Sequence, residues 1–386
     1  MLNENKFPKR AALLLLGTLL MCQAGVPCRA ATISRARIVS QIERCANVEI
    51  SMLPRNPRTG WVHGVLYIGL VDLYRATGDK TFLQPVLNIG NKVHWHIRRF
   101  GHKLTSEGSG NSYCFGQAIT SIAALHPGSV TLTPLEARCN EMLRYFKTSN
   151  GNPDKLAWWW CDSLFMAPTT FAHLSILTHK SRYVDAMNQQ WWFVTHLLYD
   201  KKEHLFFRDH RFFKKTAANG QKVFWSRGEG WVLAGTARVL KYLPADFPDR
   251  GRYIRLFDQM AAKIASLQGS DGIWRPSLLD AQQFPTPESS GTALYCYAMT
   301  WGINHHLLSK KKYMPVVAKA WAGLLAMRNK AGDLAHVQKP GDRPALVTPN
   351  VTKPYASGAF IMAGVQLLKL APFTLPPIPK LQDNNP

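Results

Sequence analysis

Apolar residues recur every three or four positions along most of the chain, the spacing of an α-helix with one buried face. Alternation of apolar and polar residues, which would indicate strands, is nearly absent from the 386 residues. The pattern predicts twelve helices, over residues 33–51, 61–76, 82–99, 115–126, 134–146, 164–178, 183–199, 231–243, 253–267, 291–308, 314–327 and 356–370.

The connections between these helices are of two kinds. Those leading into odd-numbered helices are short turns, whereas those leading into even-numbered helices are longer and hold much of the aromatic and charged chemistry. This alternation predicts a closed ring of helical hairpins, with six inner and six outer helices and the long connections on one face. Small residues such as Gly235 and Gly358 suit inner helices that crowd the axis. The alternative is a helical solenoid, but the spacing is irregular and no sequence signature repeats.

The N-terminus has the layout of a secretory signal. Lys6, Lys9 and Arg10 precede the apolar run 11–21, which is too short to span a bilayer, and small residues follow it. We therefore expect residues 1–31 to be a signal peptide and the protein to be periplasmic or secreted.

The rest of the chain is expected to be one domain over 32–372, because no linker rich in Pro, Ser or Gly divides it. The Pro-rich residues 373–386 predict an extended tail. No later apolar run is long enough for a membrane span.

Five cysteines remain after the predicted signal: Cys45, Cys114, Cys139, Cys161 and Cys296. Their number is odd and no CxxC or Cys/His ligand spacing occurs, which argues against zinc. We expect buried free thiols.

The chain holds 47 Lys and Arg against 24 Asp and Glu, a net charge of +23 that favours anionic partners. Nucleic-acid binding usually concentrates basic residues on one element, whereas here they are scattered. An acidic saccharide is therefore the expected partner and no nucleic acid is expected. The oligomeric state is left open.

Six helix N-termini on one face would form a cup that favours anions. Residues expected in this cup include aromatic rings that can stack on sugars and arginines that can hold a carboxylate. They are Trp61, Trp160, Trp225, Trp231, Arg208 and Arg227.

Asp162 is the candidate acid. It lies between aromatic residues and an apolar helix start, where desolvation would raise its pKa toward a range useful for proton transfer. Asp is also a preferred N-cap residue, so capping alone is the alternative reading.

Three segments carry a family resemblance: WWWCDSLFMAP at 158–168, FWSRGEGWVLAG at 224–235, and the stretch from DGIWRPSLLD at 271–280 to the helix that follows it. The chain resembles, over 61–370, glycoside hydrolases of the unsaturated rhamnogalacturonyl hydrolase family, which are related to the unsaturated glucuronyl hydrolases. The resemblance implies an all-α, (α/α)6 barrel of twelve helices.

The resemblance also implies a reaction. Such enzymes remove a Δ4,5-unsaturated uronic acid from the non-reducing end of lyase products by hydrating its C4=C5 vinyl ether, with no cofactor or metal. Asp162 matches the catalytic acid and base, while Arg227 and Trp231 match substrate-binding residues.

One departure stands out. The family commonly has a second acidic residue just before the fourth helix, where this chain has Asn111. Glu229 stands where an Asn is more usual; either it restores the missing carboxylate or it pairs with Arg227. A catalytically weak or silent saccharide-binding protein therefore stays open as an alternative. A polysaccharide lyase is a second alternative, because helical toroids also host those enzymes.

Overall fold

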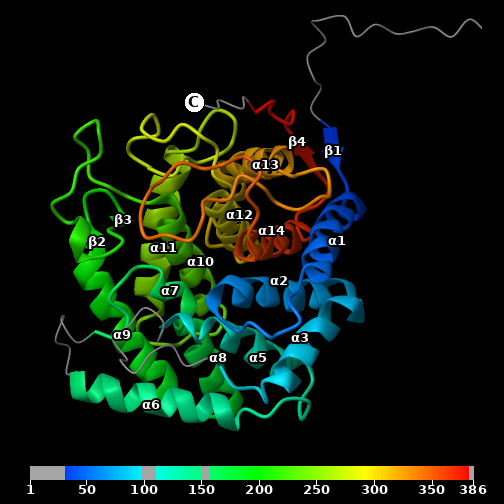
Figure 1. Cartoon of the computed structure of the whole chain (residues 1–386). Helices are drawn as coiled ribbons and strands as arrows, with labels where there is room; N and C mark the ends of the chain where they lie inside the picture. The colour runs from blue at the N-terminus through cyan, green and yellow to red at the C-terminus, as the bar shows by residue number, and fades with distance from the viewer. Residues whose placement is uncertain (1–30, 98–109, 150–155, 382–386) are drawn as a thin grey trace, which may run out of the picture.

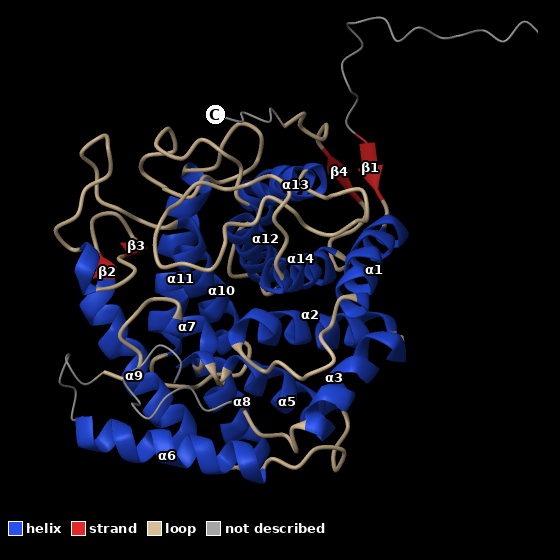
Figure 2. Ribbon diagram, viewed as in Figure 1, coloured by secondary structure: helices blue, strands red, loops and turns tan. Residues whose placement is uncertain are grey.

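The computed structural model of the protein describes residues 31–97, 110–149 and 156–381. These residues are mostly helical, with strands in two small places (Figure 2). Their helices are α1 Arg35–Ser51, α2 Trp61–Thr77, α3 Lys80–Lys92, α5 Cys114–Leu125, α6 Thr133–Ser149, α7 Ser163–Met166, α8 Pro168–Thr178, α9 Arg182–Leu198, α10 Ser226–Leu240, α11 Arg250–Ser266, α12 Ser289–Asn304, α13 Lys310–Ala326 and α14 Pro354–Leu367.

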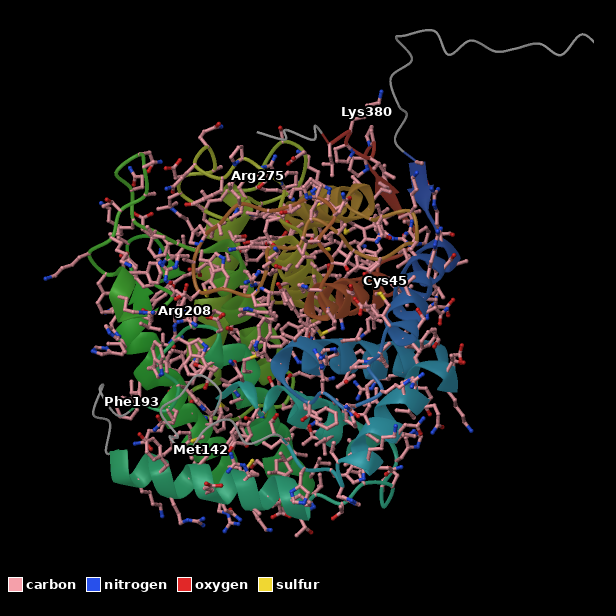
Figure 3. All side chains as sticks on the ribbon, viewed as in Figure 1. Cys45, Met142, Phe193, Arg208, Arg275 and Lys380 are labelled. Atoms are coloured by element: carbon pink, nitrogen blue, oxygen red, sulfur yellow. The ribbon has the colours of Figure 1, made fainter. Side chains whose placement is uncertain are left out.

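The inner helices form a closed ring. Helix α2 packs on α5, α5 on α8, the α7–α8 pair on α10, α10 on α12, α12 on α14, and α14 back on α2. Helices α1, α3, α6, α9, α11 and α13 lie outside this ring (Figure 1), and side chains fill the interior (Figure 3). The (α/α)6 barrel is confirmed, and ring closure rules out a solenoid.

Two glycines allow inner helices to pack backbone against backbone. A Cβ on Gly358 of α14 would lie 2.4 Å from the carbonyl oxygen of Val65 in α2. A Cβ on Gly235 of α10 would lie 2.3 Å from the carbonyl oxygen of Leu164 in α7. Both approaches are closer than any side chain permits, which confirms that small residues mark the inner helices.

The helix predicted over 164–178 is broken into α7 and α8 at Ala167. Pro168 is the first residue of α8, and its nitrogen cannot donate a hydrogen bond to the preceding turn. The Gln117 side chain from α5 holds the end of α7, since its Nε2 donates to the carbonyl oxygen of Phe165 at 2.7 Å. The break therefore positions α7, and with it the residues just before it.

A buried arginine lies among all the inner helices. Arg238 of α10 donates to Gln117 Oε1 of α5 at 2.6 Å and pairs with Asp72 Oδ2 of α2 at 3.4 Å. Its side chain also interacts with Tyr297 of α12 and lies 3.5 Å from the Met362 sulfur of α14. Through Gln117 it reaches α7 as well, so one guanidinium connects the whole ring.

Helix α10 begins at Ser226, five residues before the predicted start at 231. The Arg227–Glu229 stretch, which the sequence places in a connection, is therefore the first turn of an inner helix. Helix α3 ends earlier than predicted, at Lys92, and residues 98–99 of that prediction lie outside the described part.

The described ends of the chain are joined in a two-stranded antiparallel sheet. Strand β1, Ala31–Ile33, pairs with β4, Phe373–Leu375, at the edge of the barrel (Figure 1). A second small sheet pairs β2, Tyr199–Asp200, with β3, Leu205–Phe206. The predicted tail thus begins as a strand, while residues 1–30 of the predicted signal lie outside the described residues.

The cysteine prediction is confirmed. All five cysteines of the described chain are buried and free. Within the described residues, no helix is long and apolar enough to cross a membrane.

The position of Arg238 predicts its effect on stability. Replacing Arg238 with Ala leaves Asp72 and Gln117 without their partner inside the barrel, and we expect a loss of about 3–5 kcal/mol in the free energy of unfolding. Arg252→Ala, which removes an exposed pair with Asp249, should cost about 1 kcal/mol or less. Chemical denaturation of both variants measures the difference; similar losses would contradict the role given to Arg238.

Candidate active site

A small cavity lies at the end of the barrel where the inner helices begin. Seven of the nine residues singled out in the sequence line it: Trp61, Asn111, Trp160, Asp162, Arg208, Trp225 and Arg227. Met166 and Gly341 complete the lining. Its volume is about 40 Å³, room for a few water molecules but not for a sugar ring. A larger open hollow of about 840 Å³ between the outer helices α6 and α9 is lined by none of the nine.

Asp162 occupies the N-cap position of α7, but its carboxylate makes no capping hydrogen bond. The side chain turns instead toward Arg208, whose Nε lies 3.3 Å from Asp162 Oδ2, and toward the Cys161 thiol at 3.5 Å. The residue is only 7% exposed and borders the cavity. The capping alternative is therefore wrong for the side chain.

Arg208, labelled in Figure 3, is held in place from both its backbone and its side chain. Its carbonyl oxygen accepts a 2.9 Å hydrogen bond from the backbone N–H of Cys161, which fixes the two segments side by side. Its Nη1 donates to the buried carboxylate of Asp209 at 2.8 Å. The arginine expected to hold a ligand carboxylate is thus already paired with two carboxylates of the chain.

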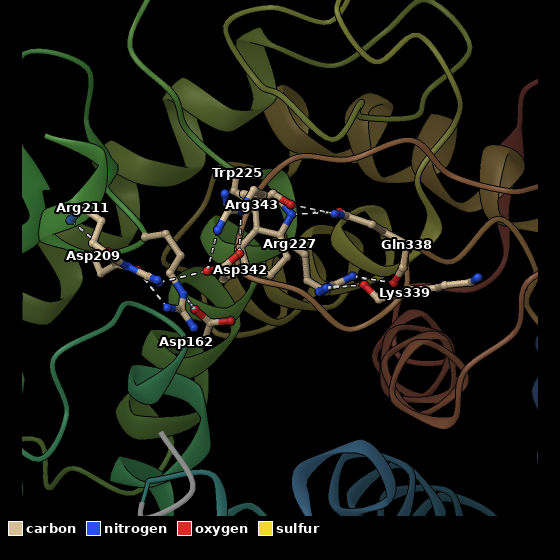
Figure 4. Close-up of polar contacts among 10 residues, drawn as sticks. Asp162, Asp209, Arg211, Trp225, Arg227, Gln338, Lys339, Asp342 and Arg343 are labelled. Carbon is tan, nitrogen blue, oxygen red and sulfur yellow. Dashed lines mark hydrogen bonds and ion pairs between the residues drawn. The ribbon is translucent and has the colours of Figure 1, made fainter. Parts of the chain in front are cut away.

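Arg227 is buried in the first turn of α10. Its Nη1 donates to the carbonyl oxygen of Gln338 at 2.7 Å, and its Nη2 donates to that of Lys339 at 3.1 Å (Figure 4). The guanidinium also lies over the rings of Trp225, at 4.5 Å, and Tyr355, at 5.2 Å. A carboxylate that binds Arg227 through Nη1 and Nη2 would have to replace these backbone carbonyls, whereas Arg227 Nε has no hydrogen-bond partner among the residues that the structure describes.

The tryptophans separate into two groups. Trp61 and Trp160 line the cavity, and a Cβ on Gly110 would lie 2.9 Å from the Trp160 ring, so glycine is needed there. Trp231 does not line it. That ring is buried behind Trp61, edge-on at 6.1 Å, and packs against Phe165 at 4.8 Å. The expectation that Trp231 stacks on the ligand is corrected: it supports Trp61 from behind.

Glu229 is also buried away from the cavity. Its Oε1 accepts a 2.7 Å hydrogen bond from the backbone N–H of Phe206, and its Oε2 has no partner. Burial raises the pKa of Glu229 well above its ordinary value; the Phe206 N–H lowers it and the charge of Asp162 raises it. Within the described residues Glu229 neither lines the cavity nor pairs with Arg227, and its raised pKa favours the protonated, uncharged form.

Asn111 stands on the cavity wall together with Asp162. At this position the amide offers hydrogen bonds and no charge. Among the described residues that line this wall, Asp162 is therefore the only carboxylate, and the buried Glu229 does not reach the cavity.

The structure adds a segment that sequence reasoning missed. Residues 338–343, in the long connection between α13 and α14, lie across the cavity and contribute Gly341 to its lining. We call them the strap. Pro340 and Gly341 mark a loop in the sequence, but no periodicity or motif shows which surface such a loop covers.

The described residues contain no group of three or more His, Cys, Asp or Glu side chains placed to hold a metal ion. The chemistry on the cavity wall is that of one carboxylate, two arginines and aromatic rings. Such a set suits proton transfer to a bound saccharide and recognition of its negative charge.

An all-α barrel with this acid and these aromatic and arginine residues defines a glycosidase of the (α/α)6 class. The chain belongs to Glycosyl Hydrolase Family 88, whose family model matches residues 34–371.

Individual relatives agree with this membership. The chain is 35% identical over 324 residues to the unsaturated 3S-rhamnoglycuronyl hydrolase of Formosa agariphila, covering 81% of this chain and 85% of that protein. A family 88 glycosyl hydrolase structure from Bacteroides vulgatus has a TM-score of 0.79 at 29% identity, covering 87% and 99%. A structure described as a polysaccharide lyase has a TM-score of 0.80 at 28% identity, covering 87% and 98%.

The buried Glu229 predicts a pH dependence of stability. Because the pKa of Glu229 is raised in the folded state, the protonated side chain makes its full contribution to the free energy of unfolding below about pH 4.5. This contribution is lost as the pH rises toward the pKa of Glu229 in the folded protein. Glu229→Gln keeps the acceptor for Phe206 and stays neutral. The variant should gain stability relative to wild type as pH rises from 5 to 8, by at most about 1.4 kcal/mol per pH unit.

Thermal unfolding across this pH range measures the difference. Glu203→Gln, which alters a carboxylate paired with Lys263 near the surface, serves as the control. A difference in stability between Glu229→Gln and wild type that does not change with pH would contradict a raised pKa for Glu229.

Proposed function

We propose that this protein removes Δ4,5-unsaturated uronic acid from the non-reducing end of acidic oligosaccharides made by lyases, by hydrating the C4=C5 vinyl ether. The observation that carries the proposal is the position of Asp162, which borders the cavity, makes no helix cap and lies beside Arg208. The relative at 35% identity, named for an unsaturated rhamnoglycuronyl substrate, supports the same class. Export, as expected from the N-terminal pattern, is part of this proposal.

In the proposed mechanism Asp162 first gives its proton to C4, which leaves a positive charge shared between C5 and the ring oxygen. A water molecule then adds to C5 and returns a proton to the Asp162 carboxylate. The hemiketal at C5 opens to a ketone, and the anomeric carbon releases the next sugar as an alcohol. The proton is recycled and no redox change occurs.

Arg208 makes the first step depend on the substrate. Next to Asp162 it favours the ionised carboxylate, which cannot donate a proton. An incoming uronate competes for this guanidinium and so favours the protonated form of Asp162. Proton donation is therefore promoted by the substrate's own charge.

Asp162→Asn tests the role of the acid. We expect a fall in turnover of roughly 10²–10⁴-fold or to below detection, because the amide neither donates nor recovers the proton. The measurement is loss of ultraviolet absorbance when the protein is incubated with a panel of unsaturated disaccharides. Asp185→Asn, on the exposed face of α9, is the control and should retain wild-type activity. Full turnover by Asp162→Asn would overturn the assignment.

Asn111 favours one second candidate, a saccharide-binding protein with little or no catalysis. If calorimetry shows binding of the unsaturated disaccharides and absorbance stays constant with every panel member, this candidate replaces the first. A rise in absorbance on intact polysaccharide would instead indicate a lyase.

A further inference from the structure

A pocket lies at the end of the barrel opposite the candidate active site. The cavity at the mouth is lined by residues at the start of inner helices, whereas this pocket is lined by the last turns of α2, α12 and α14 and by the residue that ends α10. Arg75 in its wall lies about 20 Å along α2 from Trp61 at the mouth. The volume is about 220 Å³, room for several water molecules or one small ligand. We call it the basal pocket.

Basic side chains surround the basal pocket on several sides. They are Arg35 at the first position of α1, Arg75 in the last turn of α2, Lys241 at the C-terminal end of α10, and Lys369 just after α14. Within the described residues none of the four forms a salt bridge, whereas Arg208 and Arg211 at the mouth both pair with Asp209. The basal pocket therefore holds positive charge that the described part of the chain leaves uncompensated.

Arg35 is brought to the pocket by a contact between the two ends of the fold. Its Nη1 donates to the carbonyl oxygen of Leu368 at 3.1 Å, and Leu368 also lines the pocket. The two residues are 333 positions apart, so this arrangement comes from closure of the barrel and not from the local structure of α1. Four separate elements thus direct basic groups to one place.

The usual structural role of basic residues at helix ends does not account for this set. Lysine or arginine near a helix C-terminus offsets the partial negative charge of the last carbonyl groups, and Arg75, Lys241 and Lys369 lie at such ends. Arg35, however, lies at the N-terminus of α1, where a positive charge is unfavourable. Its position next to the other three is therefore a feature of the pocket.

A histidine in the wall indicates the sign of the field inside the pocket. Burial lowers the pKa of His305, a hydrogen bond with the Trp301 carbonyl oxygen raises it, and the charges of Lys369, Lys241 and His306 lower it, with a net lowering. Its ring stacks on Trp301 with a centroid distance of 4.1 Å. A cation is thus disfavoured at this wall, and the same charges favour an anion.

One carboxylate in the lining restricts which anion fits. Asp72 Oδ2 lies 3.4 Å from Arg238 Nη1 inside the barrel, while the side chain remains 12% exposed and lines the pocket. A carboxylate accepts hydrogen bonds and repels an anion that has no donor. Hydrogen phosphate keeps a P–OH at neutral pH and a sugar phosphate has hydroxyl groups, whereas inorganic sulfate has no donor. Guanidinium and ammonium groups together suit phosphate oxygens.

We propose that the basal pocket binds phosphate, either free or as a small phosphate monoester. The four basic side chains contact the phosphate oxygens, and Asp72 accepts a hydrogen bond from the P–OH or from a hydroxyl group of the ester. The inference goes beyond the proposed function, because it concerns a separate site that takes no part in the hydrolysis.

The test is calorimetric titration of inorganic phosphate and inorganic sulfate into the protein at pH 7 and constant ionic strength. We expect one phosphate site per chain, with sulfate bound at least about ten-fold more weakly because it cannot donate to Asp72. Arg75→Gln and Lys369→Gln should each weaken phosphate binding by about five-fold. Lys319→Gln removes the same charge from an exposed position on α13, and Arg343→Gln removes it at the mouth; both should leave phosphate affinity unchanged.

Glucose 6-phosphate in the same titration distinguishes the two sources of the phosphate group. Binding tighter than that of inorganic phosphate assigns a monoester, and weaker binding assigns free phosphate. Thermal unfolding of Arg75→Gln and Lys369→Gln gives an independent reading, since a role only at helix ends would lower Tm without changing phosphate affinity.

That result would overturn the inference, as would equal affinity for sulfate or a wild-type protein that binds no phosphate. None of these measurements uses saccharide turnover. Failure of the basal pocket to bind phosphate and failure of the proposed function are therefore distinguishable.

Discussion

The barrel depends on one buried charge. The Arg238 guanidinium, contacting Asp72, Gln117, Tyr297 and Met362, reaches every inner helix directly or through one side chain. Burying an arginine is costly unless its donors are satisfied, so the helices around it have little freedom to shift or rotate. Close glycine contacts between neighbouring helices hold the rest of the ring. Geometry at the mouth of the barrel is therefore determined by packing and pairing well below it.

Helix α10 carries this constraint to the cavity. Arg238 is eleven residues from Arg227, about three turns or 16 Å along the same helix, so fixing one end positions the other. Helix α7 is placed similarly, because Gln117 satisfies a carbonyl left open by the break before Pro168. Asp162 precedes α7 directly. The rigid parts of the site are thus the first turns of inner helices, whereas the strap comes from a connection with no such support.

Much of this was predictable, and the limits have physical causes. Helical periodicity predicts the ring, and aromatic and arginine residues before the inner helices predict most of the cavity wall. The apolar pattern starts this helix at Trp231 and leaves Glu229 in the connection, whereas α10 begins at Ser226 and turns both side chains into the packed interior. The position of the strap could not be predicted. Asp342 pairs with Arg211, which lies 131 residues earlier in the chain, and no local sequence pattern indicates such a pairing.

The pairing of these charges changes what the surplus of basic residues means. Among the described residues around the cavity, Arg208 and Arg211 are paired with Asp209, and Arg227 donates to backbone carbonyls, so these guanidinium groups already have partners within the protein. Recognition of an acidic saccharide at such a site is an exchange of one set of hydrogen bonds for another. The net affinity is then a small difference between large terms, and ligands that satisfy only part of the set are rejected. Selectivity between ligands therefore depends on the protein groups that already pair with these arginines as much as on the arginines themselves.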